Sequence, residues 1–344
     1  MPFTPIQTFL GGYLLHLSSS SLLEDTGRVF GISGILNSSL FGTQELWQPS
    51  TIVGLLAGPV LSHITGLETY FPGDGLASIA QVSYGRLALA GGLVGFGTRL
   101  GSGCTSGHML CGVSRLSPRS IVATFTFFTT AVLTANISPL STSSSAVPAN
   151  RLDKPSSSTI ALFITVIAGC KLAYSVLRQT LLNTKTTSRV LRSAPYFLLG
   201  LIFSLGLSIS GMADPLKVMG FLRFPRLQHF DPSLSMVMLS GVLPNAIHYA
   251  TIKNKTPRPK FSWESWQIPT RKDIDIKLII GAVAFGAGWG LVGLCPGPAI
   301  VTLAQGFVKL TQDSSFQIDN LGKVTTFMFT TIVAMRISSL VSSK

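Results

Sequence analysis

Charged residues are scarce in this sequence of 344 residues. Asp, Glu, Lys and Arg together make up 11% of it, against roughly 25% in an ordinary globular protein. A soluble chain of this length would form two or three domains with charged surfaces, and the composition argues against that class. Mean hydropathy is +0.48, and apolar runs of about 20 residues, enough to cross a bilayer, recur along the chain. We therefore expect an integral membrane protein embedded in lipid.

Features of several other classes are also missing. The N-terminus has neither the basic segment nor the cleavage site of a signal peptide, and too few arginines for a transit peptide. The four cysteines lie in or beside apolar segments, unlike an extracellular disulfide framework. There is no CxxC pair, and His108 with scattered cysteines lacks the spacing of a metal site. We expect no metal, no cofactor and no catalytic residue, so the protein is not predicted to be an enzyme.

The net charge of +13 does not indicate nucleic-acid binding, because the cations lie mainly in the links between apolar runs. Three links are basic: Arg115–Ser120, the segment from Arg178 to Arg192, and residues 253–277. Counting spans between them places all three on one face, which the positive-inside rule assigns to the cytosol. We expect the plasma membrane, and the oligomeric state is left open.

The apolar runs predict an all-α polytopic fold in two halves. A Ser/Pro-rich linker at 138–158 separates a first half, 1–137, from a second half, 159–344, which includes the basic loop at about 253–277. Spans are expected at about 4–23, 50–67, 77–98, 120–137, 159–177, 194–212, 233–252, 276–292 and 321–341.

Two glycine-rich stretches dominate these halves. Gly91–Gly112 and Gly281–Val301 share the pattern Gly-x-x-Leu-x-x-x-Cys, which ends at Cys104 and Cys295. Each stretch predicts a half-helix, a Cys-bearing re-entrant loop and a second half-helix. Thr105 and Ser106 suit the N-cap of the half-helix after the first loop.

A shorter echo supports an internal repeat. Ile32-Ser33-Gly34 recurs as Ile209-Ser210-Gly211, each in a short, broken piece before a full span. Two such halves joined through one extra span are inverted relative to each other. Inverted repeats place their substrate site near the bilayer midplane, at the repeat interface.

The two loops offer donors for an anion. Half-helix N-termini carry unpaired N–H groups and a partial positive charge. Glycines let the backbone approach a solute closely, and the candidates for this role are Gly103, Gly107 and Gly297. Arg99 and His108 flank Cys104 and could add positive charge, although each could equally be a structural residue.

The cysteines point to a sulfur-bearing substrate. A thiol is a weak donor on a polarisable sulfur, so it suits a soft anion better than sulfate or phosphate. Apolar surroundings favour the neutral thiol, which does not repel an anion. Cys111 returns to the same helix face as Cys104 and is a further candidate, whereas Cys170 lies within a span.

At these residues the chain resembles the YeeE/YedE family of membrane proteins, which carry the sulphur-transport domain. The stretches that carry the resemblance cover both halves: Gly27–Leu36, Gly95–Ser120, Gly206–Leu222, Asp231–Met238 and Gly286–Ala299. In many bacteria the two halves look like separate small proteins, and this chain looks like their fusion.

The resemblance implies a transporter of a small sulfur-containing anion, with thiosulfate as the first expectation. Family members have an inverted repeat whose Cys-bearing loops meet mid-membrane, where thiols hand the anion on. Carried over, Cys104 and Cys295 are the loop thiols, and Cys111, or else Cys170, stands for a further pathway cysteine. Three alternatives stay open: a selenium-containing substrate, a thiol relay enzyme that moves sulfane sulfur covalently, and a structural subunit that carries no solute.

Overall fold

The structure is a computed structural model that describes residues 3–42, 45–139, 152–184, 188–253, 257–311 and 318–342. Within these ranges the regular structure is helical, apart from one isolated β-bridge between Phe3 and Leu152, so the all-α prediction is confirmed. Most of the expected 138–158 linker, and residues 254–256 of the basic loop, lie outside the described residues. The main helices are α1 (Pro5–Thr26), α2 (Ile32–Phe41), α3 (Trp47–Ile64), α4 (Gly75–Ile79), α5 (Tyr84–Leu100), the π-helix η2 (Ser106–Val113), α6 (Pro118–Ile137), α7 (Ser157–Asn183), α8 (Arg189–Ile209), α9 (Pro215–Leu222), α10 (Ser235–Val237), the π-helix η5 (Met238–Val242), α11 (Leu243–Lys253), α12 (Ile276–Val292), α13 (Pro296–Leu310) and α14 (Ile318–Ser342).

Several of these helices can cross a membrane. In the described part of the chain four helical stretches are long and apolar enough: Pro118–Ile137, Ser157–Asn183, Arg189–Ile209 and Ile276–Leu310. The last of these runs through α12 and α13 and contains the break at Cys295. The predicted polytopic membrane protein is therefore supported by the length and composition of its helices.

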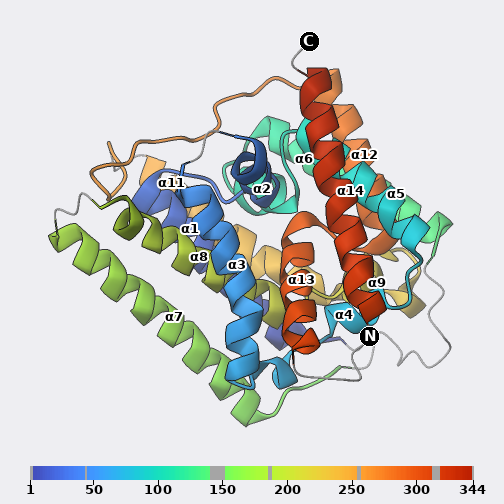
Figure 1. The fold of residues 1–344 in the computed structure, drawn as a ribbon, viewed down its shortest axis with the longest axis horizontal. Coiled ribbons are helices and arrows are strands. Elements are labelled where there is room, and N and C mark those ends of the chain that lie inside the picture. Colours follow the sequence, from blue (N-terminus) through green and yellow to red (C-terminus); the bar gives the residue numbers. More distant parts are fainter. Residues whose placement is uncertain are drawn as a thin grey trace.

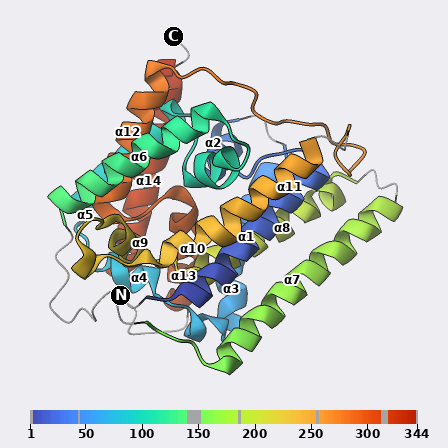
Figure 2. The same cartoon turned by 180° about the vertical axis from the view of Figure 1, so that it is seen from behind.

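The helices form two groups with shorter pieces between them (Figures 1 and 2). In one group α8 packs against α1 and α3, and the long helix α7 flanks them on the outside. Few side chains of α7 are buried, namely Phe163, Tyr174 and Leu181. In the other group α5 packs against α12 and α14, and α12 also packs against α6. Helices α2 and α13 lie between the groups.

Two expected spans are interrupted. The run at 77–98 begins as α4 and restarts as α5, because the Asp74 carboxylate accepts from Leu76 N–H and the Ser83 hydroxyl accepts from Arg86 N–H. The run at 233–252 passes through the π-helix η5, where α1 crosses closely: a Cβ added to Gly12 would lie 2.1 Å from Ser240 Oγ.

A backbone-to-backbone crossing joins α5 to α12. A Cβ added to Gly97 would lie 2.3 Å from Phe285 N, and one added to Gly281 would lie 2.2 Å from Gly101 N. Membrane helices approach this closely where small residues face each other. The end of α5 lies against the start of α12, so the two helices run antiparallel, and the cysteine loops follow at Cys104 and Cys295.

We expect Gly97→Ala to destabilise the protein markedly. The new methyl group must displace the backbone of α12, and overpacking of this kind costs about 1–3 kcal/mol or more. Gly92→Ala is the matched control on the same helix, because nothing lies within 4 Å of its Cβ position. Thermal unfolding in detergent should show a lower midpoint for Gly97→Ala alone, and equal midpoints for the two variants would contradict the crossing.

Candidate functional site

Cys104 follows a tight turn at the end of α5. Gly103 N–H donates to the Thr98 carbonyl (2.9 Å), while Ser102 adopts a left-handed conformation with φ of 64°. This is the hydrogen-bond pattern of a Schellman cap, which ends a helix and redirects the chain. The Cys104 carbonyl then accepts from His108 N–H (2.9 Å). Cys104 therefore begins a new helical segment, which continues as η2.

Cys295 also lies at the start of a helix. Its predecessor α12 ends at Gly293, whose φ of 71° places a Cβ 2.3 Å from the Pro215 carbonyl oxygen, so a side chain is excluded there. Cys295 is the N-cap of α13, and its carbonyl accepts from Ala299 N–H (3.0 Å). Because the flanking prolines have no N–H, Gly297 supplies the backbone donor between them, which is directed at the Cys295 sulfur.

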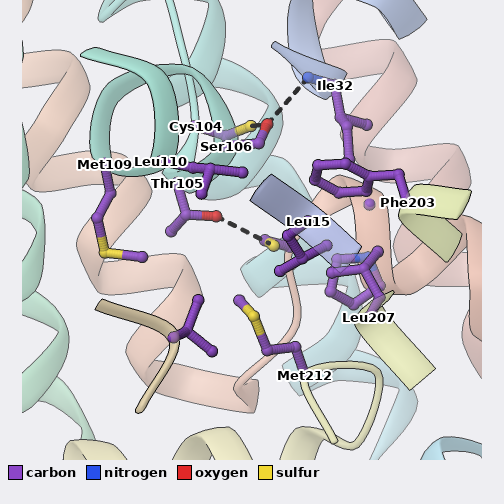
Figure 3. A pocket seen from close by; sticks show the side chains of 14 residues that line it. Leu15, Ile32, Cys104, Thr105, Ser106, Met109, Leu110, Phe203, Leu207 and Met212 are labelled. Carbon is purple, nitrogen blue, oxygen red and sulfur yellow. Dashed lines mark hydrogen bonds between the residues drawn. The ribbon is translucent and has the colours of Figure 1, made fainter. Parts of the chain in front are cut away.

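The two cysteines line one central cavity of about 20 Å³ (Figure 3). Each thiol has a neighbouring hydroxyl: Cys104 Sγ lies 3.3 Å from Ser106 Oγ, and Cys295 Sγ lies 3.6 Å from Thr105 Oγ1. The remaining walls are apolar except for backbone, and include Leu15, Ile32, Met109, Leu110, Phe203, Leu207, Met212 and Val237. A cavity of this size holds about one water molecule. It is thus a small, nearly apolar chamber whose side-chain donors are thiols and hydroxyls.

Thr105 and Ser106 do not cap the helix with their side chains as predicted. Thr105 makes no capping bond, and the Ser106 hydroxyl accepts from Ile32 N–H (3.0 Å) at the start of α2. The two hydroxyls instead lie beside thiols, that of Ser106 next to Cys104 and that of Thr105 next to Cys295. The sequence contained these residues beside Cys104 but carried no signal for their role in the cavity.

The other predicted site residues are divided among several spaces. Gly297 lines the central cavity, and a Cβ there would lie 2.5 Å from Ile32 Cδ1. Gly103, Gly107 and His108 line a larger space of about 400 Å³ on the other side of the Cys104 loop. The structure thus brings Cys104, Cys295 and Gly297 together at the central cavity. Gly103, Gly107 and His108 line the neighbouring space instead.

Three further candidates lie elsewhere. Arg99 is exposed and lines a separate space near Lys277. Cys111 is buried beside a third space, with Sγ 3.7 Å from the Phe30 carbonyl oxygen. Cys170 is half-buried on α7 and lines none of these spaces. A pathway cysteine besides Cys104 and Cys295 is therefore absent from the central cavity.

His108 holds the Cys104 loop together. Its Nε2 lies 3.0 Å from the Gly101 carbonyl oxygen, which only accepts, so Nε2 carries the proton and donates. Nδ1 then accepts from the Ser120 hydroxyl at 3.1 Å. Both ring nitrogens are engaged, and this pattern fits a neutral imidazole. The ring also lies 2.8 Å from the Cβ position of Gly103, so glycine is required there.

Both halves of the chain match family models. The model of the family described as "Sulphur transport" matches residues 9–133. A protein of Xylella fastidiosa strain Temecula1 named "Probable transporter" is 44% identical over 126 residues, which cover 37% of this chain and 89% of the relative. The chain belongs to the sulphur transport family. A second "Probable transporter", from Xylella fastidiosa strain 9a5c, is 40% identical over 107 residues, covering 31% of this chain and 71% of that relative.

In this sulphur transport protein, residues 9–133, which match the family model, include Cys104 but not Cys295. Cys295 lies in residues 193–328, which match a model described as "Family of unknown function (DUF6691)". The cavity is therefore built from both matched regions. The recognition of the sulphur-transport family from its glycine and cysteine motifs is confirmed.

Proposed function

We propose that this protein carries a small sulfur-containing anion, with thiosulfate as its substrate, across the plasma membrane and without catalysing a reaction. The observation that carries the proposal is the meeting of Cys104 and Cys295 on one cavity, from loops that lie far apart in the sequence. Membership of the sulphur transport family supports the chemical class of the substrate.

The cavity lining favours a soft anion. Its lining residues include no charged side chain, so the donors are the thiols, the hydroxyls of Thr105 and Ser106, and Gly297 N–H. Both cysteines begin helical segments, whose N-terminal ends add partial positive charge. Weak donors of this kind hold an anion without trapping it, as a carrier needs.

We propose further that residues 1–137 and 159–344 are inverted repeats around this cavity. In such repeats α5 corresponds to α12, α6 to α14, α1 to α8 and α3 to α11. Packing supports this correspondence, because contacts between helices have matching contacts between their counterparts. Helix α5 packs on α14 as α12 packs on α6, and α3 packs on α8 as α11 packs on α1. The α5–α12 and α1–α8 contacts pair equivalent elements with each other.

The cavity must widen for transport. It has room for about one water, and an oxoanion is larger. Ile32, at the start of α2, closes the cavity against Gly297 and is tied to the Cys104 loop through Ser106. Movement of the start of α2 is the change that we propose admits the anion.

The test is uptake of radiolabelled thiosulfate by cells that lack their own route. We expect cells that make the protein to accumulate the label saturably, with weak competition by sulfate because the cavity provides soft donors. If sulfate or selenite is preferred over thiosulfate in the competition, thiosulfate is not the substrate. Label recovered as a covalent persulfide on Cys104, without accumulation of the free anion, would favour the thiol relay instead.

A further inference from the structure

A second space lies behind the Cys104 loop. We call it the vestibule, defined by the roughly 400 Å³ space that Gly103, Gly107 and His108 line from one side. The same space is lined by Arg115 from the link before α6, by Arg119 at the start of α6, and by Arg271 from the basic loop before α12. The vestibule therefore lies beside two of the three basic links.

Arg119 carries a buried donor that no described residue satisfies. The residue is 5% exposed, and its Nη1 donates to the Asp273 carbonyl (2.6 Å) and to Asp275 Oδ1 (3.2 Å). Its Nη2 is buried and has no hydrogen-bond partner among the described residues. An unsatisfied buried guanidinium N–H is costly, and Arg119 is among the residues that line the vestibule.

Arg115 supplies a charge that no carboxylate in the described part of the chain pairs with. Its Nε donates to the Cys111 carbonyl (3.2 Å) and its Nη1 to the Pro269 carbonyl (3.3 Å), and it forms no ion pair within the described ranges. Arg271, in contrast, is paired with Asp273 and Asp275.

The vestibule as a whole is positive. Three arginines face the two carboxylates Asp273 and Asp275, which leaves an excess of positive charge. Hydrogen bonds from Arg271 hold the pKa of Asp273 below its ordinary value. That carboxylate therefore stays charged at neutral pH, and the count of charges already includes it. Arg99 and Lys277 line the adjoining space and add to the positive field.

Only a thin wall separates the vestibule from the central cavity. In the Cys104 loop, Gly103 and Gly107 face the vestibule, while residues 104–106 face the cavity. At the start of α2, Gly31 faces the vestibule and Ile32 faces the cavity. The Ile32–Ser106 hydrogen bond closes this wall.

We propose that the vestibule is a second anion site, which binds a small divalent oxoanion through Arg119 Nη2 and the Arg115 guanidinium. No thiol lines it, so it accepts sulfate as well as thiosulfate, whereas the cavity selects for sulfur that a thiol can contact. The naming of thiosulfate as the natural occupant rests on the proposed function. In that function the vestibule takes the anion on the basic side of the Cys104 loop.

The test is titration calorimetry on the purified full-length chain at constant ionic strength. In the double variant Cys104→Ala/Cys295→Ala, we expect sodium thiosulfate and sodium sulfate to bind with similar affinity. Adding Arg115→Gln or Arg119→Lys should weaken the binding of both anions at least tenfold. Glutamine removes the charge of Arg115, and lysine keeps the charge of Arg119 but lacks the planar fork of the guanidinium. Lys309 pairs with Asp74 at an exposed position outside the vestibule, so Lys309→Gln should leave binding unchanged.

Two results would overturn the vestibule site: absence of sulfate binding in the double variant, or unchanged affinity after Arg115→Gln. Arg119 also holds Asp275 at the start of α12, so Arg115→Gln, whose bonds reach only backbone carbonyls, decides the matter if Arg119→Lys is unstable. Binding is measured without transport, so the two proposals fail separately. If the double variant binds anions but the wild type gives no cellular uptake, only the proposed transport function is wrong. If the wild type gives uptake but the double variant binds no anion, only the vestibule site is wrong.

Discussion

Replacing Cys295 by alanine is expected to abolish most thiosulfate uptake, and Cys104→Ala is expected to do the same. Each change removes a donor from a chamber whose other walls are largely apolar. A hydrogen bond to a charged group is worth about 1.5–3 kcal/mol, which corresponds to a loss of roughly ten- to 150-fold in the ratio of maximal rate to half-saturating concentration. Initial rates over a range of thiosulfate concentrations measure this ratio.

Cys170→Ala is the matched control, because Cys170 lies on α7 outside the central cavity. It should transport like the wild type at equal amounts of protein in the membrane. Serine at position 104 or 295 separates packing from chemistry: it keeps a donor but exchanges the polarisable sulfur for oxygen. We expect serine to support less thiosulfate uptake than cysteine. Full uptake by both alanine variants would mean that the thiols only pack, and the proposed site would be wrong.

Lys217→Met is expected to produce the largest loss of stability. Lys217 is 1% exposed, and its Nζ lies 3.1 Å from Asp231 Oδ2 and donates also to Thr4 and Ser233. Removing the ammonium leaves Asp231 buried and unpaired, which costs about 3–5 kcal/mol in comparable buried pairs. Lys217 also ties α9 to the start of α1 through Thr4, so unfolding midpoints in detergent should fall sharply.

The double variant Lys217→Met/Asp231→Asn should recover part of this loss, since no buried charge is left without a partner. Lys309→Met is the control for removing an ion pair, because the side chains of Lys309 and Asp74 are 37% and 45% exposed and exposed pairs contribute little. If Lys217→Met and Lys309→Met unfold at the same midpoint, the buried pair does not stabilise the fold.

Several features were predictable from local sequence. Spans follow from runs of apolar residues, and the expected limits at 120–137 and 276–292 agree closely with α6 and α12. Breaks at the two cysteines were predictable too, because glycine and proline at those places end helices. The divided helix at α4 and α5 was missed, since the capping bonds of Asp74 and Ser83 compete locally with an otherwise continuous apolar run.

The sequence alone determined that the chain is a helical membrane protein of the sulphur transport family, with two glycine-rich cysteine loops. Only the tertiary structure decided which residues share a space. It brought Cys104 and Cys295 to one cavity, separated Arg99 and Cys111 from it, and placed Arg119 in the vestibule. The physical reason is that span length and helix breaks depend on neighbouring residues. Cavities, in contrast, depend on where helices cross, and the α5–α12 crossing joins glycines from opposite halves of the chain.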